Sequence, residues 1–259
     1  MRIIQLTDFH LNIEAEKCYR GISAELLLKE VIKEIVKNFG DFDYFVITGD
    51  LAHDESIITY ERLRDILQPL LPRCLMIPGN HDNREGIRSV FSDIVRPNTS
   101  YINFALPYSG RLLIGIDSHI TDTVYGKIGK RQLTWLDRTL SENKHVPTLL
   151  FIHHPPVPVG SPWLDEIGLK DACGLQEIIA RYPQVKAIFT GHIHHEFEGK
   201  MANCNVYGTP ATCIQFLPKA TDGKRDTSPP GFRTIIFNEG TVTTHVHFLS
   251  HWVFKEESL

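Results

Sequence analysis

The sequence lacks paired cysteines, long hydrophobic runs and an excess of positive charge. Its five cysteines are odd in number and form no C-x-x-C pair, which argues against a disulfide framework and against a thiolate zinc site. No segment approaches roughly 18 uninterrupted apolar residues, and the N-terminal apolar stretch is too short for a secretory signal. The formal net charge is -4, with no basic stripe. We therefore expect reduced thiols, a cytoplasmic location, and neither a membrane nor polymeric nucleic acid as partner.

What the sequence does contain is enough apolar residues for one large core. The chain has 259 residues and is 42% hydrophobic, and α/β domains of this length are often undivided. We expect a single domain over residues 1–259. There is no repeat of solenoid period, and no heptad seam indicates an oligomeric state. Residues 219–231, rich in proline, glycine and charge, are expected to form a long surface loop.

Strand-like and helix-like segments alternate through residues 2–192, a pattern that predicts parallel β-α-β units. In residues 23–39, apolar side chains recur every four positions behind Ser23, a residue type that favours helix N-caps. The last third differs: residues 205–216, and a pair at 232–237 and 241–249, predict antiparallel strands and a hairpin. The other expected strands are 2–8, 43–50, 73–80, 101–106, 111–118, 147–154 and 185–192, and the expected helices are 23–39, 58–71, a short one from 84, 130–142 and 174–182.

Five of the expected strands end in residues that can bind metal ions. In open α/β sheets the carboxyl ends of the strands border the crevice where sites form, so these side chains should converge. Carboxylates, imidazoles and one amide oxygen, without a thiolate, suit manganese, iron, zinc or cobalt. The seven candidate ligands are Asp8, His10, Asp50, Asn80, His153, His192 and His194.

Seven ligands exceed the need of one ion, because a catalytic ion commonly takes about three protein ligands and water. Two ions are the economical interpretation. Two ions about 3.5 to 4 Å apart, sharing a carboxylate, hold a bridging hydroxide and stabilise both the attacking and the leaving oxygen in a displacement at phosphorus. The sequence therefore predicts hydrolysis of a phosphate ester.

In chain order, the motifs D-x-H, G-D, G-N-H-D, H-x-P and G-H-x-H resemble those of the calcineurin-like metallophosphoesterases. The resemblance implies an α/β fold, a four-layer α/β/β/α sandwich with two mixed sheets. It also implies that His81 stabilises the scissile phosphate or protonates the leaving oxygen. His81 and its neighbour Asn80 are the expected catalytic residues. By this resemblance one ion is held by Asp8, His10 and His194, a second by Asn80, His153 and His192, and both by Asp50.

Three longer stretches, residues 153–171, 208–216 and 226–233, resemble bacterial class III cyclic-nucleotide phosphodiesterases, above all the cyclic-AMP enzymes. This implies cleavage of a 3',5'-cyclic nucleotide to the nucleoside 5'-monophosphate, with two manganese or iron ions, or zinc or cobalt instead. Glycerophosphodiesters or other small diesters are the alternative substrates, and a non-catalytic metal-binding scaffold is the alternative class. One departure concerns His53, which stands where the protein phosphatase branch has an aspartate, with Asp54 next.

Several aromatic residues and histidines carry weaker signals. Trp163 and Phe232 are candidates for stacking on a nucleobase, although packing is the default for an aromatic side chain. Seven other histidines are expected outside the ligand set. His154 and His195 are expected to support a ligand or to lie at the surface, and His53 and His119 to belong to the rim of the site or to a turn. His245, His247 and His251 are expected to lie exposed on or after a late strand.

Overall fold

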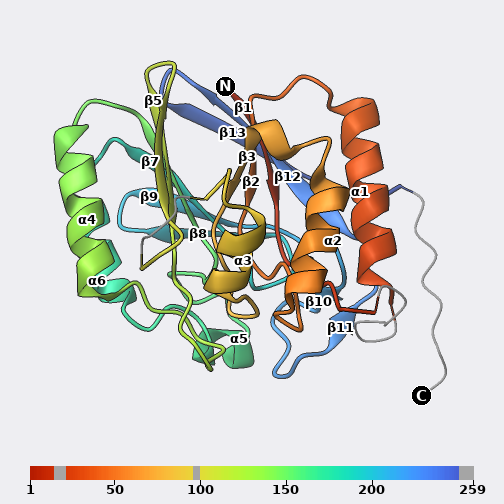
Figure 1. Ribbon diagram of the computed structural model, residues 1–259. Coiled ribbons are helices and arrows are strands. Elements are labelled where there is room, and N and C mark those ends of the chain that lie inside the picture. Colours follow the sequence, from red (N-terminus) through yellow and green to blue (C-terminus); the bar gives the residue numbers. More distant parts are fainter. Residues whose placement is uncertain (15–21, 96–99, 251–259) are drawn as a thin grey trace.

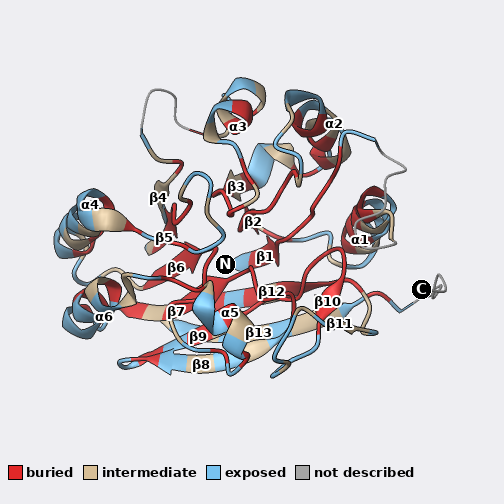
Figure 2. Cartoon of the chain, turned by 90° about the horizontal axis from the view of Figure 1, so that it is seen from below, coloured by how far each residue is buried: buried red, intermediate tan, exposed pale blue. Residues whose placement is uncertain are grey.

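The computed structural model describes residues 1–14, 22–95 and 100–250 (Figure 1). Two residues for which predictions were made, Cys18 and His251, lie outside the described residues. In the described part, two large β-sheets pack face to face, with α1 (Ala24–Asn38) and α2 (Ile57–Leu67) outside one sheet and α4 (Gly129–Glu142) and α6 (Ala172–Arg181) outside the other (Figures 1 and 2). This is the predicted four-layer α/β/β/α arrangement.

Both large sheets are mixed, as predicted. In the first sheet β1, β2 and β3 run parallel to one another, β12 pairs antiparallel with β1, and β13 pairs antiparallel with β12. In the second, β5, β6, β7 and β9 are parallel and the two edge strands, β4 and β8, are antiparallel. The first sheet has the spatial order β13 (Thr241–Phe248), β12 (Gly231–Asn238), β1 (Arg2–Leu6), β2 (Tyr44–Ile47), β3 (Cys74–Met76). The second has the order β4 (Phe104–Tyr108), β5 (Arg111–Ile116), β6 (Thr148–Ile152), β7 (Val185–Thr190), β9 (Cys204–Gly208), β8 (Phe197–Met201).

The helices and the short elements complete the described part. None of its helices is long and apolar enough to cross a membrane. The helices are α1 (Ala24–Asn38), α2 (Ile57–Leu67), α3 (Arg84–Val90), α4 (Gly129–Glu142), α5 (Pro162–Glu166) and α6 (Ala172–Arg181), with a 3-10 turn η1 (Leu71–Arg73), and the short strands are β10 (Gln215–Phe216) and β11 (Arg225–Asp226).

Three apolar layers hold the sandwich together. Val46 of β2 and Phe151 of β6 belong to the layer between the sheets and are fully buried. Val31 of α1 belongs to the layer beneath the helices of the first sheet, and Leu136 of α4 to the layer beneath those of the second. Because burying such a side chain contributes about 1.5 to 3 kcal/mol, these layers fix the position of both sheets' strand ends.

Helix α1 forms as predicted, with a small shift in its buried stripe. The Ser23 side chain accepts a hydrogen bond from the Leu26 backbone N–H, so it is the N-cap. Val31 and Ile35 are buried as expected, but Leu28 is fully buried while Leu27 is only half-buried. The helical period of 3.6 residues, rather than four, explains why the stripe moves by one position at its start.

We expect Leu28→Ala to lower the free energy of unfolding by about 2 to 5 kcal/mol, because it opens a cavity in the core. Leu26 on the same helix is 63% exposed, so Leu26→Ala should change the same quantity by less than about 0.5 kcal/mol. Urea denaturation of both variants measures the difference. Equal losses would contradict the burial of Leu28.

Some predicted elements have other bounds or other pairings. The helix predicted over 58–71 ends at Leu67, because Pro69 cannot donate a helical hydrogen bond and the chain turns into η1. The segment 205–216 is not one antiparallel strand. Its first part, β9, pairs in parallel with β7 and antiparallel only with β8, and its end forms β10. The elements that were not predicted are β8, α5, β11 and η1.

The C-terminal hairpin is confirmed. β12 and β13 pair antiparallel from Gly231↔Phe248 to Asn238↔Thr241. The two turn residues, Glu239 and Gly240, have φ of 50° and 80°, as a two-residue hairpin turn requires. The expected surface loop at 219–231 is therefore shorter, since it contains β11 and its last residue begins β12.

Candidate metal centre

The loops that follow β1, β2, β3, β6 and β7 bring the seven candidate ligands together. The first three strands are parallel in one sheet and the last two are parallel in the other, so their carboxyl ends face one region. All seven side chains are buried, and the most exposed, Asn80, has a relative exposure of only 9%. The convergence predicted from the strand ends is therefore present in the fold.

One group of ligand atoms surrounds a point next to His10. Its Nε2 lies 3.1 Å from Nε2 of His194 and 3.4 Å from Oδ2 of Asp50. Nε2 of His194 lies 3.3 Å from Oδ1 of Asp8. Ligands about 2.0 Å from a tetrahedral ion are about 3.3 Å from each other, so these separations suit one metal ion.

A second group lies on the other side of Asp50. Oδ1 of Asn80 is 2.9 Å from Nδ1 of His192 and 3.2 Å from Nε2 of His153. That same Nε2 of His153 is 3.4 Å from Oδ1 of Asp50. Asp50 therefore points one carboxylate oxygen at each group, which is the arrangement of a carboxylate shared between two ions.

The tautomers of two histidines also suit metal ions. Nδ1 of His153 lies 2.6 Å from the carbonyl oxygen of Thr48, and Nδ1 of His194 lies 2.8 Å from that of Ile214. A carbonyl only accepts, so each Nδ1 carries a proton and, in the neutral ring, Nε2 is left with a lone pair that faces the cluster. The donor set therefore fits a cation in each group.

The shifted pKa values of the buried groups in the cluster also suit metal binding. Burial raises the pKa of Asp50, but His153 and His10 beside it bring that pKa well below its usual range. Burial lowers the pKa of His153, while the facing carboxylates of Asp50 and Asp8 raise it to about 9. Without metal, protons balance the buried carboxylates. A metal ion competes with these protons for the same ligand atoms.

Backbone strain is concentrated in the same residues. Five of the seven candidate ligands have left-handed φ values between 49° and 71°, which residues other than glycine rarely adopt. Each such residue costs about 1 to 3 kcal/mol and persists where the surrounding structure enforces it, typically at functional sites. The five are Asp8, His10, Asp50, His192 and His194.

Two glycines allow the close approach of the loops. A Cβ atom on Gly79 would lie 2.1 Å from Oδ1 of Asp50. A Cβ atom on Gly191 would lie 2.1 Å from Oγ1 of Thr7 and 2.8 Å from Oδ2 of Asp8. The glycines of the G-N-H-D and G-H-x-H motifs are therefore needed for space at the cluster.

Asp82 and Tyr60 hold the G-N-H-D loop, a role that sequence reasoning missed. Oδ2 of Asp82 accepts a hydrogen bond from the Gly79 N–H, and Oδ1 accepts from the Leu51 N–H and the Tyr60 hydroxyl. Burial, together with the charge of Asp50, raises the pKa of Asp82 to about 7. The only sequence signal for Asp82 was its place in the motif, and Tyr60 looked like an ordinary helix residue.

His81 and His53 lie beside the first group. The His81 backbone N–H donates to Oδ1 of Asp50, and its ring lies 5.1 Å from that of His10 and 4.6 Å from that of His53. Nδ1 of His53 is 3.2 Å from Nδ1 of His10. His53 thus belongs to the rim of the site. His119 is buried and donates from Nδ1 to the Gly79 carbonyl.

The remaining histidines and aromatic residues differ in their burial. His154 is buried, with Nδ1 2.8 Å from the Ser118 hydroxyl, and His195 is buried as well, which lowers its pKa to about 4. Neither lies at the surface. His245 is exposed as predicted. In contrast, His247 is half-buried, and both His247 and Phe232 pack on Phe39 at the C-terminal end of α1. The default expectation of packing therefore holds for Phe232, and stacking on a nucleobase does not.

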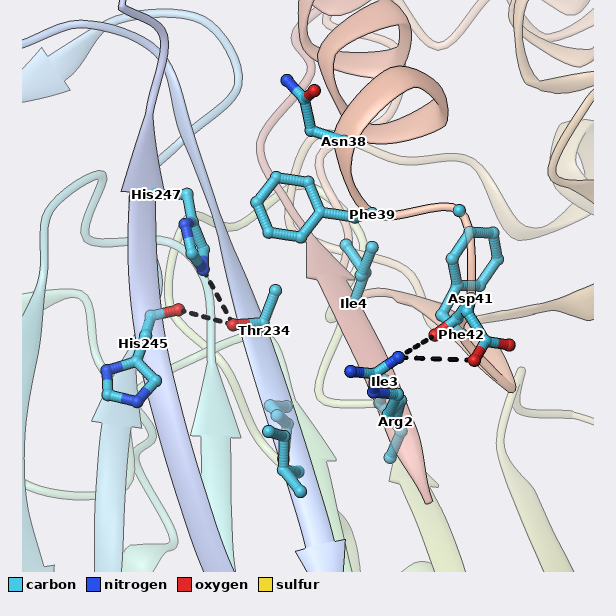
Figure 3. A pocket seen from close by; sticks show the side chains of 13 residues that line it. Arg2, Ile3, Ile4, Asn38, Phe39, Asp41, Phe42, Thr234, His245 and His247 are labelled. Atoms are coloured by element: carbon cyan, nitrogen blue, oxygen red, sulfur yellow. Dashed lines mark hydrogen bonds and ion pairs between the residues drawn. The ribbon is translucent and has the colours of Figure 1, made fainter.

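A cavity of about 170 Å³ opens onto the cluster. Beside ligand residues and His81, it is lined by Val124, Trp163, Ile167 and Phe216. A larger cavity, about 320 Å³, lies on the outer face of the first sheet between α1 and β12 (Figure 3). It contains none of the seven candidate ligands, so the smaller cavity is the one placed for chemistry.

Comparisons with known proteins agree with this geometry. The protein-family model described as calcineurin-like phosphoesterase matches residues 1–196. The chain is 33% identical over 257 residues to the 3',5'-cyclic adenosine monophosphate phosphodiesterase CpdA of Vibrio vulnificus, covering 98% of this chain and 92% of that protein. It is 32% identical over 266 residues to the CpdA of Escherichia coli K12, covering 100% and 93%. A dimetal phosphatase from Danio rerio has a similar fold, with a TM-score of 0.71, 14% identity and 96% coverage of both chains.

Proposed function

Because the chain belongs to the calcineurin-like phosphoesterase family, we propose that it is a metal-dependent phosphodiesterase that hydrolyses a 3',5'-cyclic nucleotide, with cyclic AMP as the expected substrate. The product is the nucleoside 5'-monophosphate. The observation that carries the proposal is the pair of ligand groups joined by Asp50. The substrate named for relatives of nearly full length supports the choice of cyclic AMP.

The family implies a dinuclear metal centre, and we propose its ligands in this chain. When bound, two ions acidify a water molecule and stabilise negative charge on the phosphate oxygens. We expect manganese or iron, since imidazole, carboxylate and amide ligands suit both, with zinc or cobalt as alternatives. The first ion is assigned to Asp8, His10, Asp50 and His194, and the second to Asp50, Asn80, His153 and His192.

The chain's own catalytic groups are His81 and Asn80. The hydrogen bond from the His81 N–H to Asp50 and the packing of its ring against His10 hold the imidazole at the cavity. There it can stabilise charge on the phosphate or give a proton to the leaving oxygen. The amide oxygen of Asn80 lies next to His192 and His153 and so orients the second group of ligands. A cyclic diester has one negative charge, which needs no large basic pocket.

Domain organisation and location complete the proposal. We propose that residues 1–259 form one domain, because the ligand groups and the layer between the sheets both combine residues of the two sheets. We also propose a cytoplasmic location. The four described cysteines are free thiols, which fits a reducing compartment.

The deciding experiment compares three diesters. Protein stripped with a chelator and reloaded with manganese is incubated with cyclic AMP, bis(p-nitrophenyl) phosphate or glycerophosphocholine, and the nucleotide products are separated by chromatography. We expect release of 5'-AMP by the reloaded sample and none by the stripped sample. Manganese-dependent cleavage of only the other two diesters would overturn the substrate, and cleavage of none would overturn the enzymatic assignment.

A further inference from the structure

One wall of the cavity at the metal centre is apolar. Apart from ligand residues and His81, the described residues that line this cavity are Val124, Trp163, Ile167 and Phe216. We call these four residues the apolar wall. They come from the loop after β5, from α5 and the residue that follows it, and from β10. Two of these elements, α5 and β10, are short and lie at the same end of the sandwich (Figure 1).

The apolar wall is joined directly to the ligands of the first ion. The Phe216 ring stacks on the His194 ring, with centroids 4.4 Å apart and planes 23° apart. The Phe216 N–H donates to the His194 carbonyl, and only 5% of Phe216 is exposed. The Trp163 ring meets Phe216 edge-on at 5.0 Å. The wall therefore has a fixed position relative to any phosphate at the ions.

The wall offers surface but almost no hydrogen bonds. Val124, Ile167 and Phe216 have no polar side-chain atom. The one polar side-chain atom in the wall, Nε1 of Trp163, is buried without a hydrogen-bond partner and is therefore not exposed to the cavity. What the half-buried Trp163 contributes to the cavity is carbon surface.

Resting on the proposed function, we infer that the apolar wall binds the nucleobase through its face and does not distinguish one base from another. In a 3',5'-cyclic nucleotide the phosphate is fused to the ribose, so a phosphate at the ions leaves the base one sugar ring away. Every base has a π-face, and stacking is therefore tolerant of its identity. Discrimination of about 10⁴-fold or more arises where polar groups pair with the substrate, and the wall has none to offer.

The same wall predicts a preference for nucleotides over glycerophosphodiesters. A glycerol ester has no aromatic face to place on Trp163, so it would gain only the contacts at the ions. The inference therefore deepens the proposed function: the substrate class is 3',5'-cyclic nucleotides in general, selected by an aromatic base rather than by the hydrogen-bonding edge of adenine.

The test measures kcat/KM for cyclic AMP, cyclic GMP and the base-free methyl riboside 3',5'-cyclic phosphate with the manganese-loaded protein. The variants are Trp163→Ala, Trp163→Phe and, as a matched control, Trp135→Ala. Trp135 is half-buried on α4 and packs against the core beneath the helices of the second sheet. Metal content is measured for each variant, so that a loss of ions is told apart from a loss of base contacts.

We expect cyclic AMP and cyclic GMP to agree within about tenfold. Trp163→Ala should lower both values by a similar factor of about 5 to 150, and Trp163→Phe should restore most of the loss. The base-free substrate should start at a lower value and show no such loss, and Trp135→Ala should change no ratio between substrates.

A preference for cyclic AMP over cyclic GMP of more than about a hundredfold would overturn the inference, because a base edge would then be read. An equal loss on the base-free substrate would overturn it too, because Trp163 would then support the site and not the base. Absence of hydrolysis of every cyclic nucleotide, with other diesters still cleaved, would instead be a failure of the proposed function.

Discussion

Alanine in place of Asp50 should leave the protein unable to hold either ion tightly. One oxygen of this carboxylate lies 3.4 Å from His10 Nε2 and the other 3.4 Å from His153 Nε2, so the substitution removes a ligand from both groups at once. Loss of a mere partner of a metal ligand costs about 10- to 100-fold in affinity, and loss of a shared ligand should exceed that. Hydrolysis should fall with it, since both ions are needed to stabilise the displacement.

Calorimetric titration with manganese measures the affinity for the ions, and metal analysis after dialysis measures how many ions are retained. The control is Asp65→Ala, because Asp65 is an exposed aspartate on α2 that is neither a candidate ligand nor a residue lining the cavity. It should bind two ions like the unaltered protein. If Asp50→Ala retained two ions with unchanged affinity, the assignment of Asp50 as the shared ligand would be wrong.

The second large effect is expected from His81→Ala, which should lower kcat by about 10²- to 10⁴-fold while metal content stays unchanged. His81 contacts Asp50 through its backbone N–H, which alanine keeps, so the two ligand groups should remain in place. What is lost is the imidazole at the cavity. Metal analysis together with steady-state kinetics on cyclic AMP checks both halves of the prediction.

The choice of substrate separates the two roles of His81. p-Nitrophenolate leaves without the help of an acid, whereas the ribose oxygen of cyclic AMP needs a proton. A general acid therefore predicts a smaller loss on bis(p-nitrophenyl) phosphate than on cyclic AMP, and charge stabilisation alone predicts equal losses. His145→Ala, at an exposed position, is the control. An unchanged kcat on both substrates would remove His81 from the mechanism.

Most of the fold could be predicted because its signals are local. The spacing of apolar residues and the Ser23 cap predicted α1, and the short apolar runs predicted the parallel strands of both sheets. The elements that were missed have weak local signals. β8 is an edge strand with Glu198, Gly199 and Lys200 in sequence, and α5 has only five residues and begins at a proline.

The sequence by itself determined the types of the candidate ligands, because each motif stands at the end of a strand and residues there converge in any parallel sheet. Only the tertiary structure decided which oxygen of Asp50 faces which histidine, and that Asp82 and Tyr60 hold the G-N-H-D loop. The tertiary structure also shows that Trp163 lines the cavity, whereas Phe232 packs on Phe39 and is not at the cavity. These outcomes depend on contacts between residues far apart in the chain, which no local pattern of side chains encodes.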